Sequence, residues 1–379
     1  MKTLRQRMMN DFESERGLAT RMAKLGGYAS AAKLKSTIAK EDGEIQNFGG
    51  FIKIVHDMYP EEKFDLMDKF ADTLNSNKQT IRYMLEYVSL YRLKDAKKNI
   101  LKRMFSSSSD ENREWAYLYN LDWQNLNGHV SGKDAITELS KYNFKTNEML
   151  CLSKIMSYYF YEENRNLTMM NSLCKEAREI LGFINNKFVK NSLQARLFLV
   201  ENTLHMHFNK LSRIKELEFL IENALDPIKA NVYLTFGNMY MLTNYDKSIN
   251  YLYKAMELAS TDYLKNQIVS SLNFLYVLHE KCENYIETKH DTNKLFLYCK
   301  QGNTNAAEVI FSKQNIDEMS SLQKGFNFYY KSLLYKSKDL LYTSIMHFNN
   351  AGDKFYKQLA VEELKKYETN HYLLEALGA

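Results

Sequence analysis

The stretch YLTFGNMYMLTNYDKSINYLYKAMELA, residues 233–259, indicates two helices that pack against each other. Gly237 and Tyr240 are three residues apart, so a small and a large side chain share one face of the first helix. On the second helix, Ser248 and Ala255 enclose a leucine, which gives a small–large–small pattern. Small residues let two helices approach closely, and large residues fill the groove between them. The stretch therefore predicts one helix-turn-helix repeat.

The same pattern returns further along the chain. The segment KSLLYKSKDLLYTSIMHFNNAGD, residues 331–353, repeats it, and a weaker copy lies at 297–311. Degenerate tetratricopeptide repeats of about 34 residues have this form. Because one helix pair cannot bury its apolar face alone, such pairs stack into a superhelix with an inner groove. The matching positions in the second copy are Ser332 and Tyr335 on the first helix and Ser344, Phe348 and Ala351 on the second.

The composition favours an all-α chain. Only 2 prolines and 14 glycines occur in 379 residues, too few for many strands joined by tight turns, whereas 27 tyrosines and 21 phenylalanines suit stacked helix pairs. Four widely separated cysteines predict buried thiols in a reducing compartment rather than a disulfide frame or a zinc site. Neither a signal peptide nor a membrane-spanning run is recognisable, so we expect a cytoplasmic protein.

Positive charge is concentrated at the start of the chain. Residues 1–56 hold ten Lys or Arg and six Asp or Glu, a balance of +4 within the net charge of +5. Between Arg16 and Lys40 there are six basic residues and no acidic one. The alternative is that these basic residues simply form the solvent-exposed face of a helical cap. We favour a nucleic-acid-binding role, because solvated helical faces usually mix both signs of charge.

The basic segment has the arrangement of a helix-turn-helix module. Apolar residues at helical spacing precede Gly26 and Gly27, which can end that helix in a left-handed turn, and Ser30 is a plausible N-cap for a second, basic helix. A third helix, IQNFGGFIKIVHDMY, ends just before Pro60. In such modules the second helix lies in the major groove of DNA and flanking cations meet phosphate. The candidate DNA-binding residues are Arg21, Lys24, Ser30, Lys33 and Lys35.

Two asparagines are candidates for the groove of the repeats. Asn202 follows the run ARLFLVE, and Asn238 directly follows Gly237. An extended peptide needs paired donors and acceptors, and an asparagine side chain supplies both. Each could equally be an ordinary surface asparagine, and the sequence leaves both interpretations open.

No catalytic pattern is present in the sequence. A Gly-rich phosphate loop, H-E-x-x-H and G-x-S-x-G are all absent. His205 and His207 are two residues apart on an expected helix, so they do not share a face and make a poor metal site. We therefore expect no catalytic residue, no metal and no cofactor.

Over its whole length the chain resembles the arbitrium receptors (AimR) of temperate phages that infect bacilli, which belong to the peptide-binding tetratricopeptide-repeat quorum-sensing regulators. The resemblance is carried by NFGGFIKIV at 47–55, IRYMLEY at 81–87, YLTFGN at 233–238, NAGDKF at 350–355 and YLLEAL at 372–377. It implies a homodimer that binds a paired operator site in double-stranded DNA and activates a gene opposing lysogeny. A secreted hexapeptide, imported by the host, would bind in the groove and weaken DNA binding.

The resemblance also implies which residues contact the peptide. Asp353 would pair with the arginine that such peptides typically carry, and Arg82 would neutralise a peptide carboxylate. Alternatively, Arg82 bridges two helices and Asp353 caps the turn of the last repeat. Family members carry an arginine about six residues before the threonine of the YLT motif, where this chain has Lys229. Either Lys229 replaces that arginine or this receptor binds a different peptide. The candidate peptide-binding residues are Arg82, Asn202, Lys229, Thr235, Asn238, Met241, Phe274, Asp353 and Phe355.

The tail of the chain is a candidate for dimerisation. Its terminal helix has nothing after it to cover its apolar face, so that face could pair with a second subunit. The alternative is a cap folded onto the chain's own repeats. The residues concerned are Tyr372, Leu373, Leu374 and Leu377.

The expected architecture is an all-α chain in three parts: a helix-turn-helix domain at 1–60, a right-handed superhelix of degenerate tetratricopeptide-like repeats at 61–365, and a capping and dimerisation helix at 366–379. Two rival functions remain open. A Rap-type response-regulator aspartate phosphatase has a helical bundle in place of the basic module, and a passive repeat adaptor has no need for one. The acid-free run from Arg16 to Lys40 argues against both.

Overall fold

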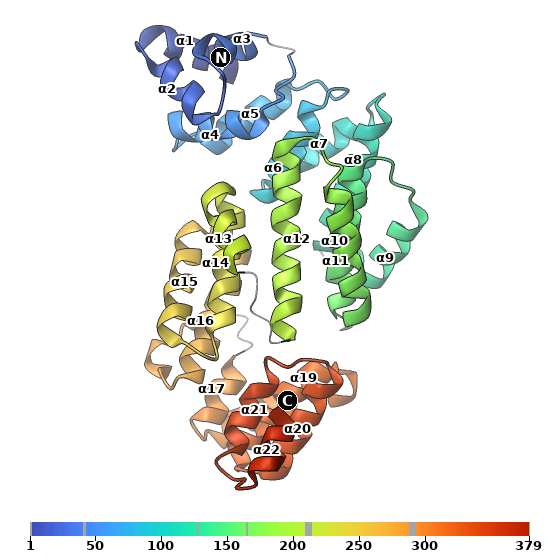
Figure 1. The fold of residues 1–379 in the computed structure, drawn as a ribbon, viewed down its shortest axis with the longest axis vertical. Helices are drawn as coiled ribbons and strands as arrows, with labels where there is room; N and C mark the ends of the chain where they lie inside the picture. The colour runs from blue at the N-terminus through green and yellow to red at the C-terminus, as the bar shows by residue number, and fades with distance from the viewer. Residues whose placement is uncertain are drawn as a thin grey trace. The chain divides into compact units, whose positions relative to one another are not determined.

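All regular structure in the described part of the chain is helical (Figure 1). The computed structural model describes residues 2–40, 43–126, 129–163, 166–208, 214–287 and 293–378. The predicted all-α class is therefore confirmed. Within these segments, no helix is both long and apolar enough to cross a membrane.

The chain forms two compact units. The first consists of Met1–Phe160 and Lys175–Gln194, and the second consists of Tyr161–Cys174 and Ala195–Ala379. Because the division falls inside α10, α11 and α12, these three helices contribute residues to both units. This structural division differs from the domain boundaries at 60 and 365 that the sequence led us to expect. Those boundaries separate regions by their expected function, and they stay a prediction.

Among the described residues, twelve helices lie in the first unit or cross into the second. They are α1 (Leu4–Ser14), α2 (Leu18–Leu25), α3 (Ala31–Ile38), α4 (Phe48–Met58), α5 (Lys63–Thr73), α6 (Thr80–Leu90), α7 (Lys94–Phe105), α8 (Asp110–Leu126), α9 (Gly132–Lys141), α10 (Asn147–Glu163), α11 (Leu167–Leu181) and α12 (Lys187–His207).

The remaining helices belong to the second unit. They are α13 (Ile214–Asn223), α14 (Asp226–Tyr240), α15 (Tyr245–Leu258), α16 (Asp262–Leu278), the 3₁₀ turn η1 (Cys282–Asn284), α17 (Lys294–Lys300), α18 (Thr304–Phe311), the 3₁₀ turn η2 (Ile316–Glu318), α19 (Ser321–Tyr335), α20 (Lys338–Asn350), α21 (Lys357–Leu364) and α22 (His371–Gly378).

Helix α1 was not expected from the sequence. It begins with a capping box, in which the Thr3 hydroxyl accepts from the Gln6 amide and the Gln6 side chain accepts from the Thr3 amide. Met8 and Phe12 on this helix are buried. The T-x-x-Q pattern at residues 3–6 is the signal that could have predicted it.

The glycine turn between α2 and α3 is fixed from two sides. Gly27 has φ +67°, the left-handed conformation predicted at the end of α2. The Ser30 hydroxyl caps α3 by accepting from the backbone amide three residues on. The Asn47 side chain donates to the Gly26 carbonyl at 2.8 Å and accepts from the Gly50 amide at 3.1 Å, which ties the turn to the start of α4.

The pair α14–α15 packs as the repeat pattern predicts. A Cβ added to Gly237 would lie 2.5 Å from Cδ2 of Leu252, so only glycine allows this approach. The Ser248 hydroxyl donates to the Gly237 carbonyl at 2.8 Å and is fully buried. The small residues therefore bring the two helix backbones together around one leucine.

The pair α19–α20 uses a different position from the one predicted. Ser332 is buried, but its hydroxyl donates to Tyr329 within its own helix. The close approach occurs at Gly325, where an added Cβ would lie 2.8 Å from the Phe348 ring and whose carbonyl accepts from the Ser344 hydroxyl at 2.7 Å. Because Gly325 lies seven residues, about two turns, before Ser332, counting back from the inter-helix loop gave the wrong residue.

Candidate functional site

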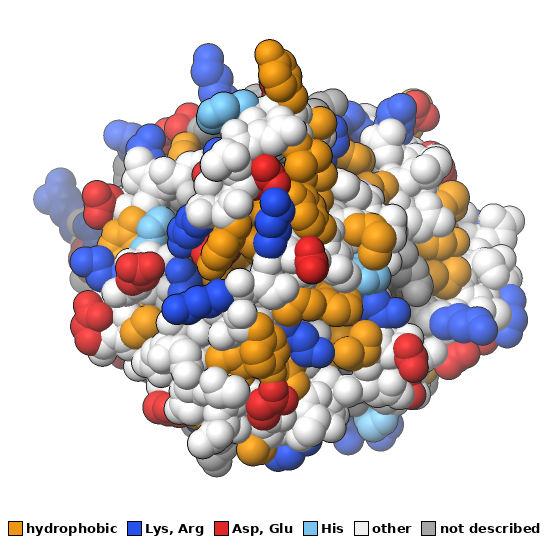
Figure 2. All heavy atoms as spheres, turned by 90° about the horizontal axis from the view of Figure 1, so that it is seen from below, with side chains coloured by type: hydrophobic (Ala, Val, Ile, Leu, Met, Phe, Trp, Pro, Cys, Tyr) orange, Lys and Arg blue, Asp and Glu red, His pale blue; other side chains and the backbone are white. Residues whose placement is uncertain are grey.

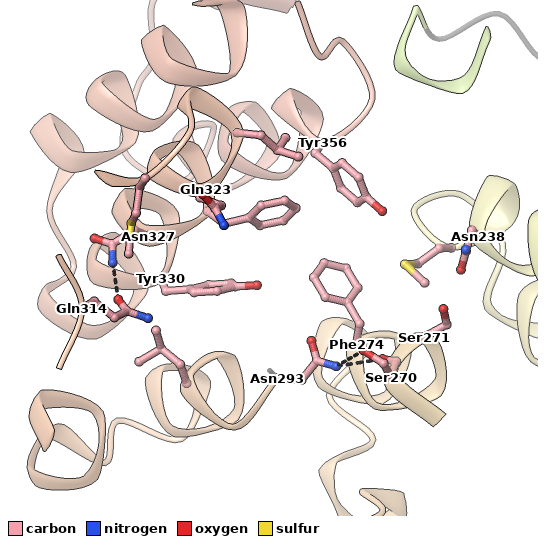
Figure 3. Close-up of a pocket in the computed structure, with 15 residues that line it drawn as sticks. Asn238, Ser270, Ser271, Phe274, Asn293, Gln314, Gln323, Asn327, Tyr330 and Tyr356 are labelled. Carbon is pink, nitrogen blue, oxygen red and sulfur yellow. Dashed lines mark hydrogen bonds between the residues drawn. The ribbon is translucent and has the colours of Figure 1, made fainter. Parts of the chain in front are cut away.

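A cavity of about 490 Å³ lies within the second unit. Figure 3 shows polar and aromatic side chains from several helices converging on it. None of the lining residues is charged. They are Asn238, Met241, Ser270, Ser271, Phe274, Asn293, Leu295, Gln314, Met319, Leu322, Gln323, Phe326, Asn327, Tyr330 and Tyr356.

One wall of the cavity is aromatic. Phe326 and Tyr356 meet edge to face with ring centroids 4.9 Å apart, and Phe274 lies 6.2 Å from each of them. Burial raises the pKa of Tyr330 well above its ordinary value, so its hydroxyl stays protonated and can donate a hydrogen bond. Such a wall offers apolar surface with a few polar handles, which suits an organic ligand.

The cavity lining also carries several side-chain amide groups. The Asn293 amide donates to the Ser270 carbonyl at 2.8 Å, and the Asn327 amide donates to the Gln314 side-chain oxygen at 2.6 Å. The side-chain oxygens of Asn238 and Asn327 are buried without a hydrogen-bond partner. An unpaired buried acceptor typically costs about 1–3 kcal/mol, so a ligand that supplies an N–H donor would relieve that cost.

The structure brings three of the predicted peptide-binding residues together. Asn238 and Met241 line the cavity from the end of α14, and Phe274 lines it from α16. Sequence reasoning missed the amides of Gln314 and Asn327 on the far wall. Asn327 lies within the aromatic run GFNFYY, where a polar residue in an otherwise buried stretch is a usable signal.

The other predicted positions in the second unit do not line this cavity. The Asn202 amide donates to the Phe198 carbonyl of its own helix, and the Thr235 hydroxyl donates to the carbonyl four residues before it. Lys229 lies 3.9 Å from Asp226. Phe355 is fully buried against Tyr356, with ring centroids 5.1 Å apart. A direct contact between these residues and a ligand stays a prediction.

Asp353 occupies a buried position where the last turn before α21 begins. One of its carboxylate oxygens lies 2.8 Å from Nδ1 of His207, and the other accepts from the Tyr356 amide at 2.8 Å. The second contact is the turn cap that the sequence left open as an alternative. Because Tyr356 lines the cavity, Asp353 supports the wall from behind.

Arg82 belongs to the first unit. Its guanidinium lies 2.5 Å from the Glu111 carboxylate and 5.9 Å from the centre of the Trp115 ring. It therefore bridges α6 and α8, as the alternative interpretation had it. Its side chain is only 12% exposed, and a role toward a peptide carboxylate stays a prediction.

The basic surface of α2 and α3 is mostly exposed. Lys24 and Lys33 are exposed, Lys35 is half-buried, and exposed Arg21 pairs with Glu15 at 3.0 Å. The Ser30 hydroxyl is already used to cap α3, so its cap role is established and its DNA contact stays a prediction. No group of His, Cys, Asp and Glu in the described residues could hold a metal ion.

The four residues of the tail divide into two groups. Leu374 is buried, and Leu377 packs against the apolar core of the second unit. Tyr372 is 85% exposed and Leu373 is half-buried. The face of Figure 2 mixes hydrophobic side chains with charges of both signs. Part of the predicted dimer face thus covers the chain's own core.

Comparison with known proteins identifies the group to which the chain belongs. A family model described as AimR transcriptional regulator-like matches residues 63–366. The AimR transcriptional regulator of Bacillus phage phi3T is 27% identical over 97% of this chain and 99% of its own length. The AimR transcriptional regulator of Bacillus phage SPbeta is 23% identical over the whole of both chains.

Solved structures agree with this match. The structure of SeMet-phAimR covers all of both chains with a TM-score of 0.75, and that of phAimR-Ligand covers 86% of this chain and 98% of its own with a TM-score of 0.78; both are 26% identical. The chain is therefore of the transcriptional-regulator class and not an enzyme. It belongs to the AimR transcriptional regulator-like family.

Proposed function

We propose that this chain is a phage regulator of the lysis–lysogeny decision, which binds operator DNA as a homodimer in the host cytoplasm. A short peptide bound in the repeat groove switches it off. The observation that carries the proposal is that one chain combines a mostly exposed basic helix-turn-helix segment, free of acidic residues from Arg16 to Lys40, with an uncharged cavity lined by amides and aromatic rings. Its relatives are transcriptional regulators, and phAimR has been solved with a ligand.

The cavity is the best-supported place for part of the peptide. Asparagine and glutamine side chains can pair with the N–H and C=O groups of a peptide backbone, and the aromatic wall can hold an apolar side chain. A peptide can shift the regulator only by the difference in its affinity for the binding and non-binding conformations, and a tenfold shift corresponds to about 1.4 kcal/mol.

Operator binding measured with and without synthetic hexapeptides ending in Arg-Gly-Ala tests the switch. The operator is a duplex recovered by the wild-type protein from a randomised pool. Peptide should weaken binding by the wild type and have little effect on Asn238→Leu, which keeps the size of the side chain but removes its polar atoms. Asp353→Ala should also respond less, although that variant loses a buried contact too. DNA binding that ignores every peptide would overturn the switch.

The DNA-binding half has its own test. Reversing both charges in Lys33→Glu/Lys35→Glu should abolish operator binding, because the two lysines lie on the helix expected in the major groove. The matched control is Lys313→Glu, an exposed lysine in the second unit. If the double variant bound DNA as well as the control, the module would be a solvated cap and the adaptor function would be favoured.

A further inference from the structure

Arg5 on α1 is buried although it belongs to the basic start of the chain. Arg5 is only 4% exposed to solvent. The guanidinium donates to the carbonyl oxygens of Thr37 at 3.0 Å, of Lys40 and of Gly43 at 2.7 Å. It also lies 5.5 Å from the centre of the Phe70 ring on α5. This arginine is therefore withdrawn from the surface on which the other basic residues of the module lie.

Of the carbonyls that Arg5 contacts, that of Thr37 belongs to the last turn of α3, and those of Lys40 and Gly43 belong to the segment that follows this helix. The last turn of a helix leaves carbonyl groups without an intrahelical partner, and a cation placed there both satisfies them and opposes the negative end of the helix dipole. Because guanidinium donors have a fixed fork geometry, contacts to Thr37, Lys40 and Gly43 define where the end of α3 lies relative to α1.

The start of α3 is held separately. Ser30 caps it, and Asn47 ties the preceding turn to α4 through the Gly26 carbonyl. With Arg5 at the other end, α3 is held at both termini. The basic side chains between the termini take no part in these holding contacts. A helix that reads DNA must present its side chains within a narrow range of orientations, since base contacts depend on bidentate geometry.

We propose that Arg5 is a positioning residue for operator recognition: it sets the orientation of α3 from behind and does not contact DNA. This inference rests on the proposed function of the module. A positioning role affects the preference for the operator and not the affinity for any duplex. Phosphate contacts supply affinity for any duplex, whereas correctly oriented base contacts supply preference for the operator.

The test compares Arg5→Met and Arg5→Lys with Arg7→Met. Arg7 is the matched control, because it lies on the same helix, pairs with Glu62 at 2.8 Å and stacks over Tyr59 instead of reaching α3. Affinity is measured for the selected operator duplex and for a random-sequence duplex over a range of salt concentrations. Hydrogen exchange of the amides at 37–40 is measured on the same full-length proteins.

Arg5→Met should lower operator affinity at least tenfold, change random-duplex affinity less than twofold and leave the salt dependence unchanged. Amide exchange at the end of α3 should accelerate, and Arg5→Lys should restore part of the preference. Equal losses on both duplexes with a salt slope reduced by about one would make Arg5 a phosphate contact and overturn the proposal. Unchanged exchange and preference would overturn it as well, as would equal loss of preference in Arg7→Met.

The proposed function can fail on its own in this design. A wild-type protein without any preference for a selected duplex would reject operator binding. The exchange measurement would still report whether Arg5 holds the end of α3, because it requires no DNA.

Discussion

The side chains of His207 and Asp353 meet inside the second unit, with Nδ1 and Oδ2 2.8 Å apart and both residues buried. The pair joins the last residue of α12 to the turn after α20. The Lys354 amide donates to the His207 carbonyl at 2.7 Å, which adds a second link at the same place. Because Asp353 also accepts from the amide of cavity-lining Tyr356, the pair fixes part of the cavity wall.

Removal of Asp353 should destabilise the protein in the absence of any ligand. Loss of one partner of a buried hydrogen bond leaves the other polar group without its contact, which typically costs about 1–3 kcal/mol and more where a charged group is involved. We therefore expect Asp353→Ala to lower the free energy of unfolding by about 3 kcal/mol in urea titrations. Asp317→Ala is the control, since that carboxylate is exposed in the same unit and its loss should stay within about 0.5 kcal/mol.

A double-mutant cycle separates the pair from general damage. If the two side chains act together, His207→Ala should add little to the loss caused by Asp353→Ala. Fully additive losses would show that the contact between them contributes nothing to stability.

Asn238→Leu should affect ligand binding and stability in opposite directions. The variant removes a side-chain oxygen that is buried without a partner, so the free energy of unfolding should stay the same or rise by about 1 kcal/mol. Peptide affinity, measured by calorimetry, should fall tenfold or more if the ligand donates to that oxygen. Asn231→Leu is the matched control on the same helix, because its amide already donates to the Pro227 carbonyl outside the cavity lining.

Two adjacent glycines of α4 should respond differently to the same change. A Cβ on Gly50 would collide with the Gly26 carbonyl in the helix-turn-helix turn, whereas a Cβ on Gly49 would meet Phe188 at 3.5 Å, an ordinary contact. We expect Gly50→Ala to destabilise the protein by about 1–3 kcal/mol and to weaken DNA binding. Gly49→Ala should be neutral or stabilise the helix by up to about 1 kcal/mol. Equal thermal unfolding midpoints would contradict this assignment of the turn.

The sequence predicts the helices and the basic module well because both are local patterns. Gly27 adopts the expected left-handed turn, Ser30 caps the expected helix, and Gly237 meets the expected second helix of its pair. Each of these depends on residues close together in the chain. Counting residues back from the inter-helix loop failed for the α19–α20 pair. These two helices approach each other closely at a point further from the loop, so the small residue at the contact is the earlier Gly325.

The cavity could be predicted only in part, because its walls come from segments far apart in the chain. Asn238 was found from its place next to Gly237 in the repeat motif, and Phe274 was named only among the candidates that accompany the family resemblance. The Asn327–Gln314 amide pair depends on how α19 packs against the segment after α18. The contact between His207 and Asp353 spans 146 residues, and no local pattern specifies it. Such distant pairs are set by tertiary packing.

The link between α20 and the tail should depend on acid pH. The Lys338 ammonium, the Asn370 amide and the Tyr342 hydroxyl together lower the pKa of Glu368 to about 2 from an ordinary value of 4.5. A carboxyl group whose pKa is lowered by folding stabilises the folded state fully above its ordinary pKa and loses that contribution as the pH falls toward the folded value.

Glu368→Gln should therefore have a lower urea midpoint than the wild type at pH 7. The difference should shrink progressively between about pH 4.5 and pH 2. A difference that stayed constant across this window would mean that the charge of Glu368 is not what holds Lys338 and Tyr342 in place.

The tail offers a direct separation of folding from dimerisation. Tyr372 is 85% exposed, whereas Leu374, two residues later on α22, is buried against the core. If the exposed face pairs with a second subunit, Tyr372→Ala should raise the dimer dissociation constant tenfold or more in sedimentation experiments, because exposed tyrosines are frequent anchors of interfaces. Its effect on urea unfolding at a concentration where the protein is monomeric should be small.

Leu374→Ala should instead lower the stability of the fold, without acting on the exposed face directly. Removal of a buried leucine side chain costs about 2–5 kcal/mol, so this variant should unfold at lower urea whether or not the protein is a dimer. A Tyr372→Ala variant that stays fully dimeric would place the subunit contact elsewhere and leave α22 as a cap on its own repeats. Loss of the dimer in Tyr372→Ala together with weaker operator binding would tie the tail to DNA recognition, since two modules must then be held at the spacing of a paired site.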